Sequence, residues 1–201
     1  MRPGYSLLQT RRWRSRNSCR KIASGLTGAT AITTSKLQDT VTQPWWGVIK
    51  PGDGESLWQP VPSQGYVTLK FSADNTPYDS FTSGIQVLPP GCHVREHGHK
   101  RNHELIFIHA GEGEVEIEGE TYSVSKGCTV LFGRYARHII TNTGDTDLEM
   151  FWVFMPPGLE DWFRGIGQVR HPGDKMPAPF PRPDGVEALM EHMRFVPPAK
   201  R

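Results

Sequence analysis

The stretch GCHVREHGHKRNHELIFIHAG, residues 91–111, is the most informative part of the chain. It holds five of the eight histidines, in a mostly polar loop followed by a strand-like run. His97 and His99 are separated by one residue, and in an extended segment residues two apart point the same way. Glu104 begins the next run, and His138 lies in a later one, RHIITN. Three imidazoles and one carboxylate that converge would suit a first-row divalent ion.

The rest of the chain favours short strands over long helices. Its 21 glycines and 17 prolines predict many turns. Eight runs, several with alternating apolar and polar residues, are candidate strands: 66–72, 81–88, 103–110, 113–119, 121–124, 128–132, 137–142 and 148–155. Regularly spaced short strands of this kind are typical of an antiparallel sandwich or barrel.

The spacing of the histidine-rich stretch resembles a known family. Gly91-x5-His97-x-His99-x4-Glu104-x6-Gly111 matches the first cupin motif at every fixed position. The second motif aligns with Gly127, His138 and Asn142, with Gly133 where proline is usual and Tyr135 where glycine is usual. The resemblance covers roughly residues 45–155.

Resemblance to cupins implies an all-β fold, an antiparallel β-barrel or jelly roll with the metal inside. It implies His97, His99, Glu104 and His138 as ligands of one divalent transition metal: Fe, Mn, Ni, Cu or Zn. It also implies open coordination positions for water, substrate or dioxygen. Glu104 is a candidate catalytic residue as well, as a proton acceptor.

Three further residues are candidates for substrate binding. His93 and Arg95 share the parity of His97 and would line the barrel mouth, where Arg95 could pair with an anionic substrate. Arg134 shares the parity of His138 across a turn. For each of them a solvated surface position is the alternative. His103 and His109 share the opposite parity to Glu104, so we expect both outside the barrel.

Four segments are predicted. Residues 1–38 are a disordered or targeting leader, 39–65 an N-terminal arm, 66–155 the barrel and 156–201 a helical extension. One short helix should follow Pro157. A second should begin at PDGVEALMEHM, with Asp184 as N-cap and Glu187 completing a capping box. We expect both helices to pack on the outside of the barrel or to close one end.

The charge distribution excludes a typical nucleic-acid-binding domain. Eight of the 23 Lys and Arg residues lie in 1–38, which contains no acid, so 39–201 carries 15 cations against 21 acids. No apolar run is long enough to cross a membrane. We expect a cytoplasmic protein; the Arg- and Ser-rich leader makes mitochondrial import the alternative. We expect Cys92 and Cys128 to be reduced, and a disulfide bond between them is the alternative.

Three functions are compatible with these residues. The first is a quercetinase-like, metal-dependent dioxygenase acting on a small enolate, phenolate or diketone-like substrate. The second is a metal-dependent lyase, dehydratase or isomerase that uses no oxygen. The third is a non-catalytic small-molecule-binding cupin. Resemblance to single-barrel cupins also implies a homodimer, and the Trp-rich arm at 44–58 is a candidate contact because aromatic residues are enriched at interfaces.

Overall fold

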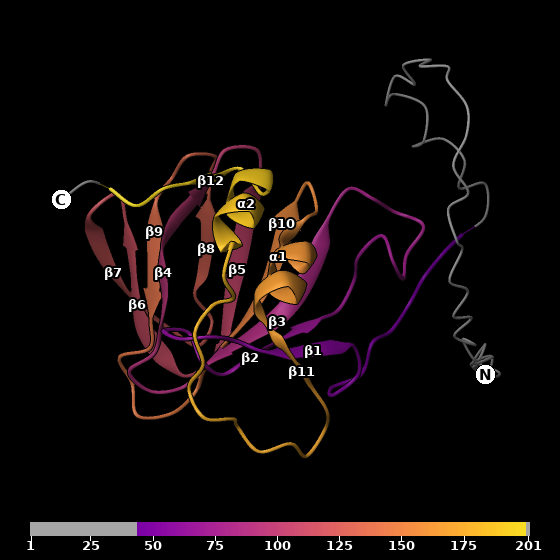
Figure 1. Ribbon diagram of the computed structural model, residues 1–201, viewed down its shortest axis with the longest axis horizontal. Helices are drawn as coiled ribbons and strands as arrows, with labels where there is room; N and C mark the ends of the chain where they lie inside the picture. The colour runs from indigo at the N-terminus through magenta and orange to yellow at the C-terminus, as the bar shows by residue number, and fades with distance from the viewer. Residues whose placement is uncertain (1–43, 200–201) are drawn as a thin grey trace, which may run out of the picture. The chain divides into compact units, whose positions relative to one another are not determined.

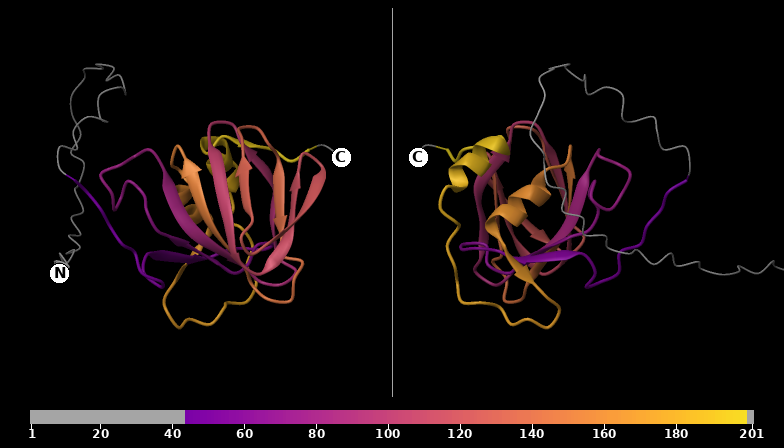
Figure 2. Two further views of the ribbon diagram at one scale, coloured as in Figure 1. Left: turned by 180° about the vertical axis from the view of Figure 1, so that it is seen from behind. Right: turned by 45° about the vertical axis from the view of Figure 1, so that its right-hand side comes forward.

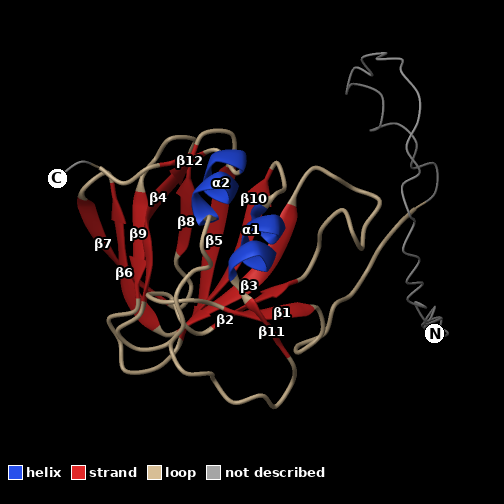
Figure 3. Cartoon of the chain, viewed as in Figure 1, coloured by secondary structure: helices blue, strands red, loops and turns tan. Residues whose placement is uncertain are grey.

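The computed structural model describes residues 44–199, which build two antiparallel sheets and two short helices (Figures 1 and 3). The seven-stranded sheet contains, in spatial order, β11 (Gln168–Arg170), β1 (Glu55–Trp58), β2 (Tyr66–Leu69), β3 (Thr82–Leu88), β10 (Leu148–Met155), β5 (His103–Ala110) and β8 (Thr129–Phe132). The five-stranded sheet contains β12 (Phe195–Val196), β4 (His93–His99), β9 (His138–Thr141), β6 (Glu112–Ile117) and β7 (Glu120–Ser125).

The all-β jelly-roll prediction is confirmed, with the two sheets stacked as separate layers rather than joined into a closed barrel (Figure 2). Each of the eight predicted strands is present, as β2, β3 and β5 to β10. The alternation of apolar residues works as expected on β10, where Met150, Trp152 and Phe154 are buried. Side chains that face inward from both layers form one apolar core.

The region around His97 corrects one expectation. Residues 93–99 form strand β4 rather than a polar loop, because they pair with β9 and β12. The pairing of β4 with β9 runs from Val94↔Ile140 to His97↔His138, so three steps on β4 match two on β9. This extra residue is a β-bulge, which changes which side chains face inward. Parity counted along the sequence therefore fails across residues 94–97.

Both predicted helices are present, on the same side of the two sheets (Figures 1 and 2). Helix α1 (Leu159–Ile166) buries Leu159, Trp162, Phe163 and Ile166 in the core. Helix α2 (Val186–His192) begins after Gly185, at φ 76, with no side-chain cap. The predicted capping box of Asp184 and Glu187 was therefore wrong, because the left-handed glycine redirects the chain between them.

The N-terminal arm is more structured than expected. Its residues 55–58 form β1, which pairs with both β2 and β11. Trp58 is buried and Trp45 makes an edge contact with Phe71, whereas Trp46 is 80% exposed.

The remaining predictions concern the chain ends and the cysteines. The leader, 1–38, and the start of the arm, 39–43, lie outside the described residues, and the location that depends on them stays a prediction. No helix within 44–199 is long and apolar enough to span a membrane. Cys92 and Cys128 are both free thiols, so the bridge between them is not formed.

Candidate metal centre

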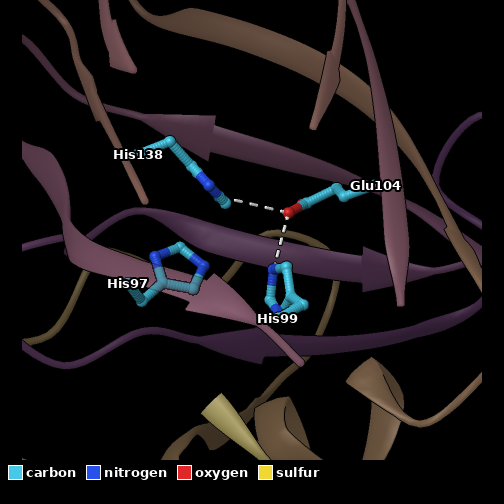
Figure 4. Close-up of side chains that lie close together, drawn as sticks. All are labelled: His97, His99, Glu104 and His138. Atoms are coloured by element: carbon cyan, nitrogen blue, oxygen red, sulfur yellow. Dashed lines mark hydrogen bonds and ion pairs between the residues drawn. The ribbon is translucent and has the colours of Figure 1, made fainter. Parts of the chain in front are cut away.

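The four predicted ligands lie together between the two sheets (Figure 4). His97 and His99 come from β4 and His138 from β9, all in the five-stranded sheet, while Glu104 comes from β5 in the opposite one. One donor atom from each of the four side chains lies within 4.8 Å of the others. The centre therefore joins the two layers of the fold.

Strand register brings these side chains together. His97 lies directly opposite His138 in the β4–β9 pair, and their ring centroids are 4.3 Å apart. His99 follows two residues later, so its side chain points to the same face as that of His97. Glu104 is the second residue of β5, at the same end of the fold.

Backbone hydrogen bonds set the protonation of two imidazoles. His97 Nδ1 lies 2.8 Å from the Arg95 carbonyl oxygen, and His138 Nδ1 lies 3.0 Å from that of Ala136. A carbonyl oxygen can only accept, so each Nδ1 carries the hydrogen and each Nε2 keeps a free lone pair. Such contacts orient metal-binding histidines in general.

The buried nitrogens of the centre fit a metal ion. His99 and His138 are each 1% exposed, and His99 Nδ1 and His138 Nε2 have no hydrogen-bond partner. Unpartnered buried polar atoms are costly, and a cation would satisfy the lone pair on His138. Three imidazoles with one carboxylate suit a first-row transition metal better than Ca²⁺ or Mg²⁺, which prefer oxygen donors.

The carboxylate of the centre is held ionised. Glu104 Oε2 lies 3.0 Å from His99 Nε2 and 3.4 Å from His138 Nε2. Burial by itself would raise the pKa of Glu104, but the close imidazoles of His138 and His99 outweigh it and hold the pKa far below its usual range. Burial and the neighbouring imidazoles lower the pKa of His97. The centre therefore presents a neutral His97 imidazole and one negative carboxylate.

Aromatic rings hold the imidazoles in place. Phe132 stacks on His138, with centroids 3.7 Å apart and planes 6° apart. His99 contacts Phe154 edge-on at 4.7 Å, and Phe195 of β12 contacts His97 at 5.7 Å and His99 at 5.3 Å. Side chains packed in this way have little freedom, so the donors are held close to one geometry before any metal binds.

The turns around the centre explain several motif positions. A Cβ on Gly111, at φ 77, would overlap the Asp147 carbonyl oxygen. Tyr135, which replaces the usual glycine, adopts φ 68, a conformation that favours glycine, and its N–H donates to the His99 carbonyl at 2.8 Å. Asn142 is fully buried and donates to the carbonyls of Leu88 and Thr146. Asn142 therefore braces the fold rather than binding the ion.

A cavity of about 640 Å³ opens onto the centre, with His97 and Glu104 in its wall. Arg95 lines it, as the sequence predicted, because it lies within the bulge of β4. His93 does not line it, since the bulge reverses its parity relative to His97. Arg134 is exposed and also outside the cavity, on the turn before β9.

Sequence reasoning missed the opposite wall of the cavity. It comes from the C-terminal extension and includes Trp162 and Phe163 of α1, Arg182 of the connector and Phe195. The helices were predicted to pack outside the sheets or close one end, but no motif relates residue 182 to residue 97. The outward positions of His103 and His109 agree with their half-buried state, and His109 Nε2 lies 3.3 Å from Glu149 Oε2.

Comparison with known proteins supports the fold and the centre. Residues 84–154 match the family model described as a cupin domain. An L-ectoine synthase of Aliivibrio fischeri is 36% identical over 63 residues, which cover 30% of this chain and 49% of that protein. A 5-nitrosalicylic acid 1,2-dioxygenase of a Bradyrhizobium species is 36% identical over 70 residues, covering 35% and 33%. The chain spans about half the length of the first curated relatives it matches.

Among solved structures, the chain is similar to a predicted oxalate decarboxylase of Thermotoga maritima. The two are 24% identical with a TM-score of 0.48, over 55% of this chain and 99% of that one. The segment that matches the family model contains all four donors, and its strands supply both layers around them. Residues 84–154 of this chain therefore form a cupin domain, and that domain supplies the candidate metal centre.

Proposed function

We propose that this protein is a metal-dependent dioxygenase that acts on a small anionic substrate. The observation that supports it best is the cluster of three histidines and one glutamate, of which His97 and Glu104 lie in the wall of a large cavity. The volume of that cavity falls in the range typical of small-molecule sites. The similarity to a 5-nitrosalicylic acid 1,2-dioxygenase agrees with this chemistry over one third of the chain.

The four donors would hold the metal, and Fe, Mn, Ni, Cu and Zn are all compatible with them. A bound redox metal supplies Lewis acidity and a place for dioxygen beside an activated substrate. Nε2 of His97 and of His138 face the site with free lone pairs, because their Nδ1 atoms are hydrogen-bonded to carbonyls. With a divalent ion and one carboxylate, the site keeps a formal charge near +1, which favours an anionic oxygen of the substrate.

Glu104 is the candidate base of the site. Its carboxylate is ionised and lies in the cavity wall. Its low pKa makes it a weak base, so it would accept the proton of an enol or phenol only when a bound metal acidifies that hydroxyl, and would return the proton to the product. The aromatic and aliphatic side chains of α1 and β12 form part of the opposite wall and give the substrate an apolar surface.

A second function is favoured by the similarity to L-ectoine synthase. Here the same centre would acidify a proton next to a carbonyl or carboxylate, and Glu104 would remove it in a lyase, dehydratase or isomerase that needs no oxygen. A non-catalytic binding protein is the third alternative. Only turnover, and its dependence on oxygen, separates the three.

The first test is the metal content of the untagged full chain by mass spectrometry, beside a His97→Ala His99→Ala variant. We expect about one transition metal per wild-type chain and none in the variant. Oxygen uptake is then recorded with a flavonol, a β-diketone and salicylate. Uptake with any of them supports the dioxygenase. Turnover without oxygen favours the second function, and absence of metal after reconstitution contradicts both.

We also propose that the chain forms a homodimer through its N-terminal arm. Trp46 and Val48 of this arm are 80% and 85% exposed, which is unusual for large apolar side chains. Sedimentation equilibrium of the wild type and of a Trp46→Ser Val48→Ser variant tests this. We expect a dimer that the variant weakens; a wild-type monomer at micromolar concentration contradicts the proposal.

A further inference from the structure

Two arginines line the cavity without an acidic partner. Arg95 lies in the bulge of β4, and Arg182 lies in the connector before α2. Within residues 44–199, the arginines that form ion pairs with acids are Arg137, Arg164 and Arg194. Arg95 is exposed and donates one hydrogen bond to the Val61 carbonyl, whereas Arg182 is half-buried. A half-buried cation without an acidic partner favours an anionic ligand.

The surroundings of Arg182 also favour an anionic ligand. Its guanidinium lies over the Trp162 ring, 5.0 Å from the centroid, and its Nε is buried with no hydrogen-bond acceptor. Burial and the nearby charge of Arg95 lower the pKa of Arg182 to about 10, so it remains protonated at neutral pH. A buried donor without a partner costs free energy that a ligand oxygen would recover.

An aromatic surface connects Arg182 with the metal centre. Trp162, under the guanidinium, contacts Phe195 edge-on at 4.9 Å, and Phe195 contacts His97 at 5.7 Å. Trp162 and Phe195 both line the cavity. A ligand that reaches from the arginines to the donors would therefore lie along flat apolar side chains, which favour an aromatic or similarly apolar body.

Acids at the same cavity limit the charge of this ligand. Glu96, Asp184 and Glu187 also line it, and Glu96 accepts a hydrogen bond from the Ala199 N–H. They offset part of the positive field of the two arginines. A monoanion therefore fits better than a dianion such as phosphate, whose desolvation among apolar walls costs more.

We propose that Arg182 and Arg95 bind the carboxylate of a small substrate whose apolar body lies against Trp162 and Phe195. The opposite end of that substrate faces His97 and Glu104. The carboxylate contacts do not involve the metal ligands. This assignment therefore depends on the proposed function only in stating which end of the substrate reacts. The planar fork of a guanidinium matches the two oxygens of a carboxylate.

The test uses a pair of probes that differ in one group. Salicylate and salicylamide share the ring and the hydroxyl, but only salicylate carries a carboxylate. Binding of each to the full chain, metal-loaded and metal-free, is measured by isothermal titration calorimetry. Inorganic phosphate is the third probe. We expect salicylate to bind more tightly than salicylamide and phosphate in both forms of the protein.

Arg182→Gln should weaken salicylate binding about 10- to 100-fold and change salicylamide binding by less than about threefold, because one charged hydrogen-bond donor is lost. Arg95→Gln should act in the same direction. The salicylate affinity of Arg182→Lys should lie between those of the wild type and Arg182→Gln, since lysine keeps the positive charge but lacks the planar guanidinium. Arg170→Gln is the matched control, because Arg170 also lies 5.0 Å over a tryptophan ring, that of Trp58, but outside the cavity.

Several results would overturn the assignment. The assignment is wrong if salicylate does not bind at millimolar concentration, or if salicylamide binds as tightly as salicylate. It is also wrong if phosphate binds more tightly than salicylate, or if Arg182→Gln binds salicylate as tightly as the wild type. Circular dichroism shows whether each variant is folded. If Arg182→Gln does not fold, the binding measurements on Arg182→Lys and Arg95→Gln test the assignment. A chain that takes up no metal yet prefers salicylate through Arg182 would contradict the proposed function and leave this inference standing.

Discussion

The two walls of the cavity are built in different ways. The metal wall comes from β4, β5 and β9 within residues 84–154, the segment that matches the cupin family model. Three of its four donor residues are buried and His97 is half-buried. Strand register pairs His97 with His138, and backbone carbonyls orient both imidazoles. The opposite wall comes from residues 159–198, outside that match, and consists of apolar side chains with Arg182, Asp184 and Glu187.

This difference separates two tasks. The metal wall needs exact positions, which a pair of hydrogen-bonded strands supplies because each residue has a defined partner. The opposite wall selects the substrate by shape and charge, so helices and loops can change without disturbing the donors. We expect substitutions on the metal wall to change metal affinity, and those on the opposite wall to change ligand binding or local stability.

The largest effect should come from removing one donor. His138→Ala should weaken metal binding by more than about 100-fold, since even the loss of a partner that only orients a ligand costs 10- to 100-fold. Met190→Ala, on the α2 side of the same cavity, should change it by less than about threefold. Competition with a coloured chelator measures both. Equal losses in the two variants would mean that the walls are not independent.

A smaller effect is expected from the residue that braces the metal wall. Asn142→Ala removes two donated hydrogen bonds and one accepted from the Gly144 N–H, all inside the protein. We expect the free energy of unfolding to fall by about 2–4 kcal/mol, because buried carbonyls lose their donors. Urea titration measures it.

Asn102→Ala is the matched control for Asn142→Ala. Asn102 Nδ2 makes one bond, to the Pro156 carbonyl at the start of the C-terminal extension. Its loss should cost about 1 kcal/mol. A larger loss than in Asn142→Ala would place the main brace of the fold at the junction with the extension.

Phe195 lies where the two walls meet, in contact with His97, His99 and Trp162. Phe195→Leu keeps an apolar side chain but removes the ring contacts. We expect a loss of about 1–1.5 kcal/mol in thermal unfolding experiments, with metal affinity within about threefold of the wild type. A tenfold loss of metal affinity would show that the extension also orients the donors.

The smallest effect should be stabilising. Tyr135 is 60% exposed and adopts φ 68, so Tyr135→Gly relieves a left-handed conformation with little loss of packing. The gain should be at most about 1 kcal/mol, because glycine also has more freedom in the unfolded chain. Differential scanning calorimetry measures it. If Tyr135→Gly instead lowers the stability, the packing of the Tyr135 side chain contributes more free energy than its exposure suggests.

The metal ligands and the strands could be predicted because both follow short patterns. The spacing of His97, His99 and Glu104 and the alternation along residues 148–155 are local features that can be counted. The position of His93 outside the cavity was not predictable, because a bulge depends on pairing with β9. The predicted N-terminal cap of α2 was wrong for a related reason. Asp184 and Glu187 fit the sequence pattern of a capping box, but Gly185 turns the chain between them.

By itself, the sequence determined the donor types, their spacing and the all-β character, because these depend on residues near one another in the chain. Only the tertiary structure decided that the donors span two layers, that His93 lies outside the cavity, and that Arg182 and Trp162 form the wall opposite His97. Residues 97 and 182 meet because the C-terminal extension packs its apolar side chains against the sheets. That contact depends on burial in three dimensions, which no spacing along the chain records.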